Sequence, residues 1–111
     1  MAQIAIIAPC ESLASIATET VQQMDMNVQI RTALLGGAIE IAKQLRKKGT
    51  QVLISRGGTA LMLKNAPDLG LPVVEIPVTA YDVVQALVKA RKFGPRIGVI
   101  GFENMISEAE T

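Results

Sequence analysis

Apolar and polar residues follow one another along the chain in blocks that predict strands and helices in alternation. Strands are predicted at five apolar runs, Gln3–Ala8, Met26–Arg31, Gln51–Ile54, Val73–Ile76 and Arg96–Ile100. Helices are predicted between these runs, over Ser12–Met24, Leu35–Lys48, Gly58–Asn65 and Thr79–Lys92. In the second and fourth helical segments the apolar residues recur every three or four positions, so each of these helices has one face suited to packing on a sheet.

The order of these segments indicates the fold class. Strands that are joined by helices are normally parallel, because a right-handed crossover returns the chain to the same sheet edge. The run Met26–Arg31 alternates apolar with polar residues, as an edge strand does, whereas Gln3–Ala8 and Gln51–Ile54 are almost wholly apolar, as central strands are. We therefore expect a three-layer, doubly wound α/β fold with a parallel five-stranded sheet in the flavodoxin-like order 2-1-3-4-5.

Composition excludes several kinds of chemistry. The chain has 111 residues, a net charge of +1 and no histidine, so Ser-His-Asp and Cys-His catalytic systems and most zinc sites are absent from it. Cys10 is its only cysteine, which excludes an internal disulfide and fits a reducing cytoplasm. The longest apolar runs are far shorter than the roughly twenty residues that cross a bilayer. We expect a cytoplasmic protein that binds no metal or cofactor and does not contact a membrane.

Most basic residues fall in two clusters that end in Gly49 and Gly94, which is typical of helix C-termini. Arg56 belongs to neither cluster. It lies in Ser55-Arg56-Gly57-Gly58-Thr59, directly between a predicted strand and a predicted helix. Two glycines allow successive backbone N–H groups to converge at a helix N-terminus, and a guanidinium beside them suits a carboxylate or phosphate. These five residues therefore predict an anion pocket, with a plain turn and a solvated arginine as the alternative.

Ligands of open parallel sheets bind beyond the carboxyl ends of the strands, where further segments of this chain meet. The other candidate effector-binding residues at these ends are Ser12, Thr79, Tyr81, Asp82, Phe102 and Asn104. Structural roles compete with this interpretation, since Ser12 and Thr79 with Asp82 can cap helices, Glu75 can pair with a cation such as Arg56, and the two rings can simply pack. The acidic positions that a phosphoacceptor receiver domain requires are absent, and no nucleotide-binding glycine motif is present. No catalytic residue is predicted.

Three blocks carry a resemblance to a known family. They are Val52–Ala60, which contains the letters SRGGTA, then Pro72–Asp82, and then Ile97–Asn104. Together and in this order they resemble the PrpR N-terminal domain family, the sensory domain of propionate-catabolism activators and related sigma-54-dependent regulators. The resemblance runs from about Ile4 to the end of the chain.

The resemblance implies a two-lobed effector-sensing domain, of which residues 1–111 would be the first lobe, with Gly101–Asn104 leading into the second. The implied effector is a small anionic metabolite, a polycarboxylate such as 2-methylcitrate. DNA and sigma-54 RNA polymerase would be partners only through other domains, which include an ATPase module. We expect the domain to be no enzyme, and to form a homo-oligomer through apolar groups around Tyr81 and Phe102. The alternative function is a lobe of a small-molecule-binding α/β enzyme of flavodoxin-like or sugar-isomerase-like build.

Overall fold

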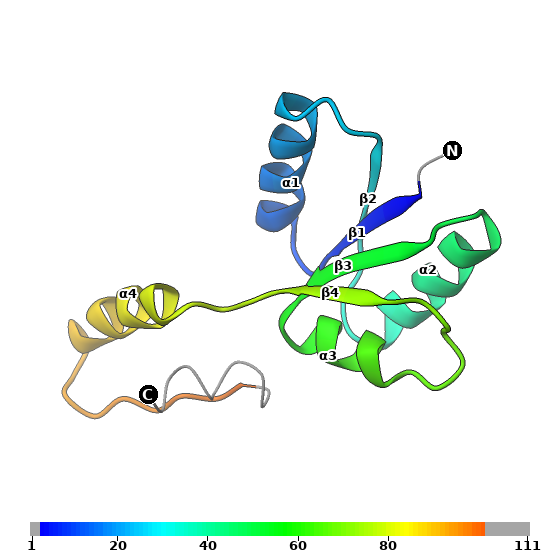
Figure 1. Ribbon diagram of the computed structural model, residues 1–111. Helices are drawn as coiled ribbons and strands as arrows, with labels where there is room; N and C mark the ends of the chain where they lie inside the picture. The colour runs from blue at the N-terminus through cyan, green and yellow to red at the C-terminus, as the bar shows by residue number, and fades with distance from the viewer. Residues whose placement is uncertain (1–2, 102–111) are drawn as a thin grey trace. The chain divides into compact units, whose positions relative to one another are not determined.

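The computed structural model describes residues 3–101, and the contacts between residues divide the chain into two units. The first unit is Met1–Ile76 and the second is Pro77–Thr111 (Figure 1). The division falls at Pro77, whereas the segment that the resemblance implies as the lead into a second lobe is Gly101–Asn104. Of that segment, Gly101 is described and residues 102–104 lie outside the described part of the chain.

The first unit is a parallel α/β sheet. Its strands are β1 (Ile4–Ala8), β2 (Val28–Thr32), β3 (Val52–Arg56) and β4 (Val73–Ile76). Its helices are α1 (Glu11–Gln23), α2 (Gly36–Lys47) and α3 (Gly57–Asn65). The described strands pair in the order β2-β1-β3-β4, and every pair is parallel. The fold class, the first four strands and their order are thus confirmed.

The register of the strands assigns their side chains to two faces. Ile6 pairs with Ile30 and Ile54, so these isoleucines share one face, and α1 lies on this side against β1 and β2 (Figure 1). The intervening residues, among them Ile7 and Leu53, point to the other face, where α2 and α3 lie side by side. Helices therefore cover both faces of the sheet, as a doubly wound arrangement requires.

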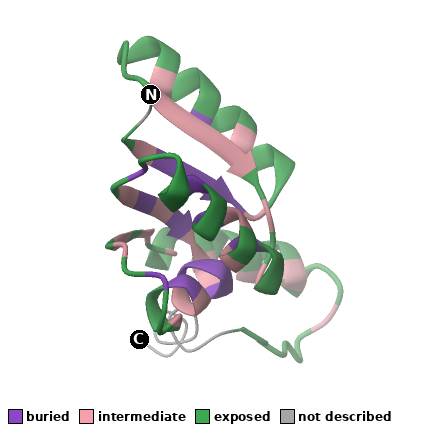
Figure 2. Ribbon diagram, turned by 90° about the vertical axis from the view of Figure 1, so that its right-hand side faces the viewer, coloured by how far each residue is buried: buried purple, intermediate pink, exposed green. Residues whose placement is uncertain are grey.

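The core lies between the sheet and the pair α2 and α3. Its fully or almost fully buried side chains are those of Ala5, Ile7, Ala38, Ala42, Leu45, Leu53, Leu63 and Leu69. The three from α2 recur at positions 38, 42 and 45, which is the spacing of one helix face. Buried residues gather on β1, β3 and the start of α3, while β2 is half-buried, as its alternating sequence predicts (Figure 2).

The predicted fifth strand is not confirmed. Residues 96–100 are described and form neither strand nor helix. A strand exists only where a neighbouring backbone supplies its hydrogen-bond partners, and an apolar run alone cannot provide them. This segment belongs to the second unit, where its side chains border the helix α4 (Ala80–Arg91). The described sheet accordingly has four strands.

Candidate functional site

The carboxyl edge of the sheet in the first unit brings three helix N-termini together. Strands β1, β2 and β3 are parallel, and each is followed by a short turn and a helix, so α1, α2 and α3 all begin at this edge (Figure 1). Each helix start carries part of the positive end of a helix dipole. The edge is therefore a region of positive potential built mainly from backbone.

The start of α3 is the turn that the sequence singles out. Arg56 is its N-cap residue, with extended backbone, and the Arg56 side chain does not form a capping hydrogen bond to the helix. Gly57 follows with a φ of 64°, a left-handed conformation that other residues adopt only with strain, which explains a glycine at this position. Gly58 is buried. The predicted tight strand-to-helix turn is thus present, whereas its role in binding stays a prediction.

Two hydroxyl groups predicted to face a ligand make bonds inside the fold. Ser55 is 0% exposed, and its Oγ donates a hydrogen bond of 2.7 Å to the carbonyl oxygen of Ile7 in β1. Thr59 is 1% exposed, and its Oγ1 accepts a hydrogen bond of 3.1 Å from the backbone N–H of Leu35. Any contribution of these two residues to binding therefore acts through the position of the turn.

Cys10 and Ser12 lie at the start of α1, and the charge of Arg56 interacts electrostatically with Cys10. Cys10 is the N-cap residue, and its exposed Sγ lies 3.2 Å from the Oγ of Ser12. The Ser12 hydroxyl holds the pKa of the Cys10 thiol below its ordinary value, helped by the backbone N–H of Leu13 and by the positive charge of Arg56. The predicted cap by Ser12 is wrong, because the helix begins one residue earlier and Ser12 lies in its first turn.

The sequence contains a second strand-glycine-glycine-helix turn that was not predicted as part of the site. Gly36 and Gly37 open α2, directly after Leu35, and a Cβ placed on either glycine would have nothing within 4 Å. Neither glycine has a positive φ, so neither packing nor backbone conformation within the described chain requires glycine here. The shared pattern of two glycines after a strand could have revealed this turn.

The second unit carries the remaining described candidates, on α4. Thr79 and Asp82 form a capping box: the Oγ1 of Thr79 accepts from the N–H of Asp82 at 3.2 Å, and Asp82 Oδ2 accepts from the N–H of Thr79 at 3.0 Å. The predicted helix-capping role of this pair is confirmed. The hydroxyl of Tyr81 accepts a 2.7 Å bond from Gln85, one turn further along.

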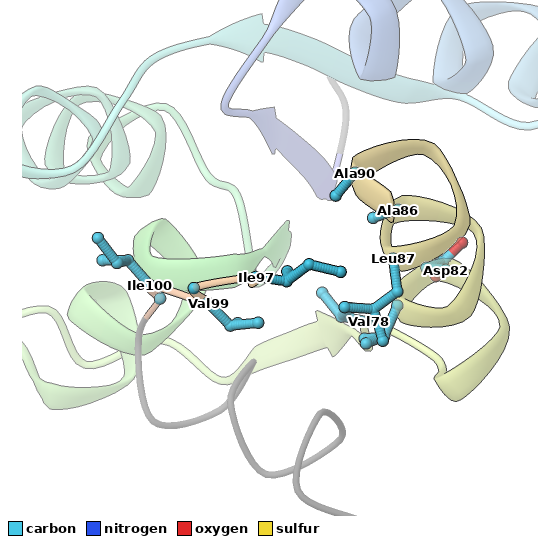
Figure 3. A pocket seen from close by; sticks show the side chains of 11 residues that line it. Val78, Asp82, Ala86, Leu87, Ala90, Ile97, Val99 and Ile100 are labelled. Carbon is cyan, nitrogen blue, oxygen red and sulfur yellow. The ribbon is translucent and has the colours of Figure 1, made fainter. Parts of the chain in front are cut away.

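An apolar hollow of about 330 Å³ also lies within this unit, between α4 and residues 97–101 (Figure 3). Its apolar lining includes Val78, Leu87 and Ile97, whereas Asp82 is the charged residue among those that line it.

The structure brings some of the predicted residues together and leaves others apart. Ser12 and the segment 55–59 share the carboxyl edge of the first unit, and Thr79, Tyr81 and Asp82 share the start of α4 in the second. Phe102 and Asn104 lie outside the described residues. Glu75 pairs with a cation, as its structural interpretation predicted: its Oε1 lies 3.0 Å from the Nζ of Lys64.

Within residues 3–101 there is no cluster of three or more potential metal-ligating side chains, and no helix long and apolar enough to span a membrane. A protein-family model described as propionate catabolism activator matches residues 22–111 of the chain. No solved structure matches it.

Proposed function

Since this chain belongs to the propionate catabolism activator family, we propose that it is an effector-sensing domain of a transcriptional regulator and that its ligand is a small anionic metabolite. A polycarboxylate such as 2-methylcitrate is the proposed ligand class. The domain performs no chemistry itself, and it acts in the cytoplasm by shifting the regulator between inactive and active populations. DNA and sigma-54 RNA polymerase are contacted by other domains of the regulator.

The observation that supports an anionic ligand is the meeting of three helix N-termini with Arg56 at the carboxyl edge, and the lowered pKa of the Cys10 thiol agrees with it. A thiolate is itself an anion, so a lowered pKa means that the surroundings favour negative charge at this point of the carboxyl edge. Hydrogen bonds from the Ser12 hydroxyl and from the backbone of α1 are the main causes of this lowered pKa, and the charge of Arg56, at the start of α3, adds a smaller contribution. A carboxylate bound between the two helix starts would meet the same groups.

Cys10 can therefore serve as a reporter of the proposed site. Its pKa is measured from the pH dependence of its alkylation by iodoacetamide, with and without 2-methylcitrate at constant ionic strength. A bound polycarboxylate places negative charge near the thiolate, so the ligand should raise the pKa of Cys10 and slow alkylation near neutral pH. Sodium chloride at matched ionic strength controls for screening, which weakens charge interactions without binding.

Two variants make the test specific. Arg56→Ala should raise the pKa of Cys10 in the free protein and remove the response to 2-methylcitrate. Lys47→Ala removes the same charge from the opposite end of α2 and should leave both unchanged. If millimolar 2-methylcitrate leaves the alkylation profile of the wild-type chain unaltered, or if Arg56→Ala still responds to it, the proposed site is wrong.

A further inference from the structure

The turn that leads into α2 strains a residue that is not glycine. Leu35 has a φ of 50° and a ψ of −122°, a combination that a Cβ atom makes unfavourable. The N–H of Gly37 donates a 3.2 Å hydrogen bond to the carbonyl oxygen of Leu34, so residues 34–37 form a β-turn. A positive φ at its first central residue alone is the mark of a type II′ turn, in which that residue is usually glycine. Here the glycine, Gly36, comes one position later.

Hydrogen bonds fix the direction of the peptide that joins Leu35 to Gly36. The carbonyl oxygen of Leu35 accepts a 2.9 Å bond from the N–H of Ala38 and therefore points into the first turn of α2. This peptide is trans, so the N–H of Gly36 points the opposite way, out of the helix and beyond the carboxyl edge, where α3 also begins (Figure 1). The preceding peptide is held separately, because the N–H of Leu35 donates to Thr59.

Rotation of this single peptide would relieve the strain. Turning it over changes only the ψ of Leu35 and the φ of Gly36, and converts the turn from type II′ to type I′. Leu35 then enters the left-handed helical region, which a side chain tolerates better, and Gly36 takes a positive φ, which glycine adopts freely. The rotation breaks the bond from Ala38 and keeps the bond to Thr59. Relief of strain and loss of one hydrogen bond are effects of similar size, so both orientations are accessible.

We propose that the Leu35–Gly36 peptide is a two-state switch, and that the anionic effector selects the orientation in which the N–H of Gly36 points beyond the carboxyl edge. This inference rests on the proposed function. The outward N–H attracts an anion, whereas in the other orientation the carbonyl oxygen of Leu35 takes its place and repels one. Selection of the N–H orientation also completes the first hydrogen bond of α2, so the ligand would order the start of this helix. The second orientation requires glycine at position 36, although the present φ does not.

Amide hydrogen exchange of Ala38 in the free protein tests the switch without any ligand. This N–H has its 2.9 Å partner only while the carbonyl of Leu35 points into α2. Leu35→Asn produces an Asn-Gly pair, which strongly favours type I′ turns, and should speed the exchange of Ala38 at least several-fold. Gly36→Ala disfavours the positive φ of the second orientation and should slow this exchange at least several-fold.

Each of these variants has a matched control at a neighbouring residue. Leu34→Asn and Gly37→Ala make the same substitutions outside the rotating peptide, and both should leave the exchange of Ala38 unchanged. All rates are divided by that of Ala42, in the middle of α2, which removes effects of overall stability. Equal rates in the two test variants, or equal changes in their controls, would overturn the proposal.

The affinity for 2-methylcitrate tests the role of the ligand. Leu35→Gly removes the strain from the N–H orientation, whereas Leu35→Asn favours the other orientation. By isothermal titration calorimetry, Leu35→Gly should bind 2-methylcitrate at least several-fold more tightly than Leu35→Asn does. Equal affinities would show that the ligand does not select between the orientations. Absence of binding to the wild type would refute the proposed function and the ligand's part in this proposal, while the exchange rates of the free protein would still confirm or overturn the switch itself.

Discussion

Replacing Ser55 by alanine tests whether this residue supports the fold of the carboxyl edge. Pairing between β1 and β3 is recorded as far as Ile6 and Ile54, and the hydroxyl of Ser55 then joins the strands by its 2.7 Å bond to the carbonyl of Ile7. Both residues are 0% exposed, so water cannot replace the lost donor. Loss of a buried hydrogen bond of this kind costs about 1–2 kcal/mol. The removed oxygen is small, so little cavity cost is added.

The assay should report on the unfolding of the first unit, which contains Ser55. Tyr81, the only tyrosine, lies in the second unit, so far-UV circular dichroism during urea unfolding is the better probe of the sheet. With an m-value of about 1 kcal/mol/M for a small domain, Ser55→Ala should lower the urea midpoint by about 1–2 M. Ser15→Ala, exposed on α1, is the matched control and should change stability by less than about 0.5 kcal/mol. If Ser55→Ala unfolds like the control, the structural role assigned to Ser55 is refuted.

Two further predictions concern helix starts. Thr79→Ala removes the capping box of α4 and should destabilise that helix by about 1 kcal/mol. Circular dichroism should show a loss of helical ellipticity in Thr79→Ala and none in Thr79→Ser. Equal spectra for the two variants would contradict this prediction. Gly57→Ala places a side chain on a left-handed backbone and should destabilise the first unit by about 1 kcal/mol. Gly37→Ala, which has open space around it, should stabilise the unit by up to about 1 kcal/mol. Both effects are read from urea midpoints, and shifts of the same sign would show the reasoning to be wrong.

Much of the fold can be predicted from the sequence because strand burial leaves a direct pattern. The wholly apolar run Ile4–Ala8 became the central strand β1, and the alternating run at Val28–Thr32 became the half-buried edge strand β2. The run at 96–100 also suggested a strand, because it contains Ile97, Val99 and Ile100. Whether such a run becomes a strand depends on a neighbouring backbone that can pair with it, and the sequence of the run does not reveal that backbone. The place of residues 96–100 in the second unit could therefore not be predicted.

The candidate site was predicted less well, for a different physical reason. The glycines of the α3 turn mark a backbone conformation, and Gly57 has it. The direction in which the Ser55 side chain points depends instead on the alternation of side chains along β3. Ser55 lies two residues after the buried Leu53 and therefore on the same inner face, an argument that was open from the sequence. The bond from Leu35 to Thr59 joins two turns that are 24 positions apart, and no local pattern reveals it.

That bond also limits how far the α3 turn can be transferred to another protein. Leu35 has a φ of 50° and a ψ of −122°, a conformation that only glycine adopts without strain, and its N–H is fixed by the Thr59 hydroxyl. The geometry of the α3 start thus depends on a neighbouring turn as well as on its own residues. Grafting residues 55–60 onto another parallel sheet would transfer the amino-acid sequence of the turn without its backbone conformation. A design that keeps this conformation has to include residues 33–38 as well.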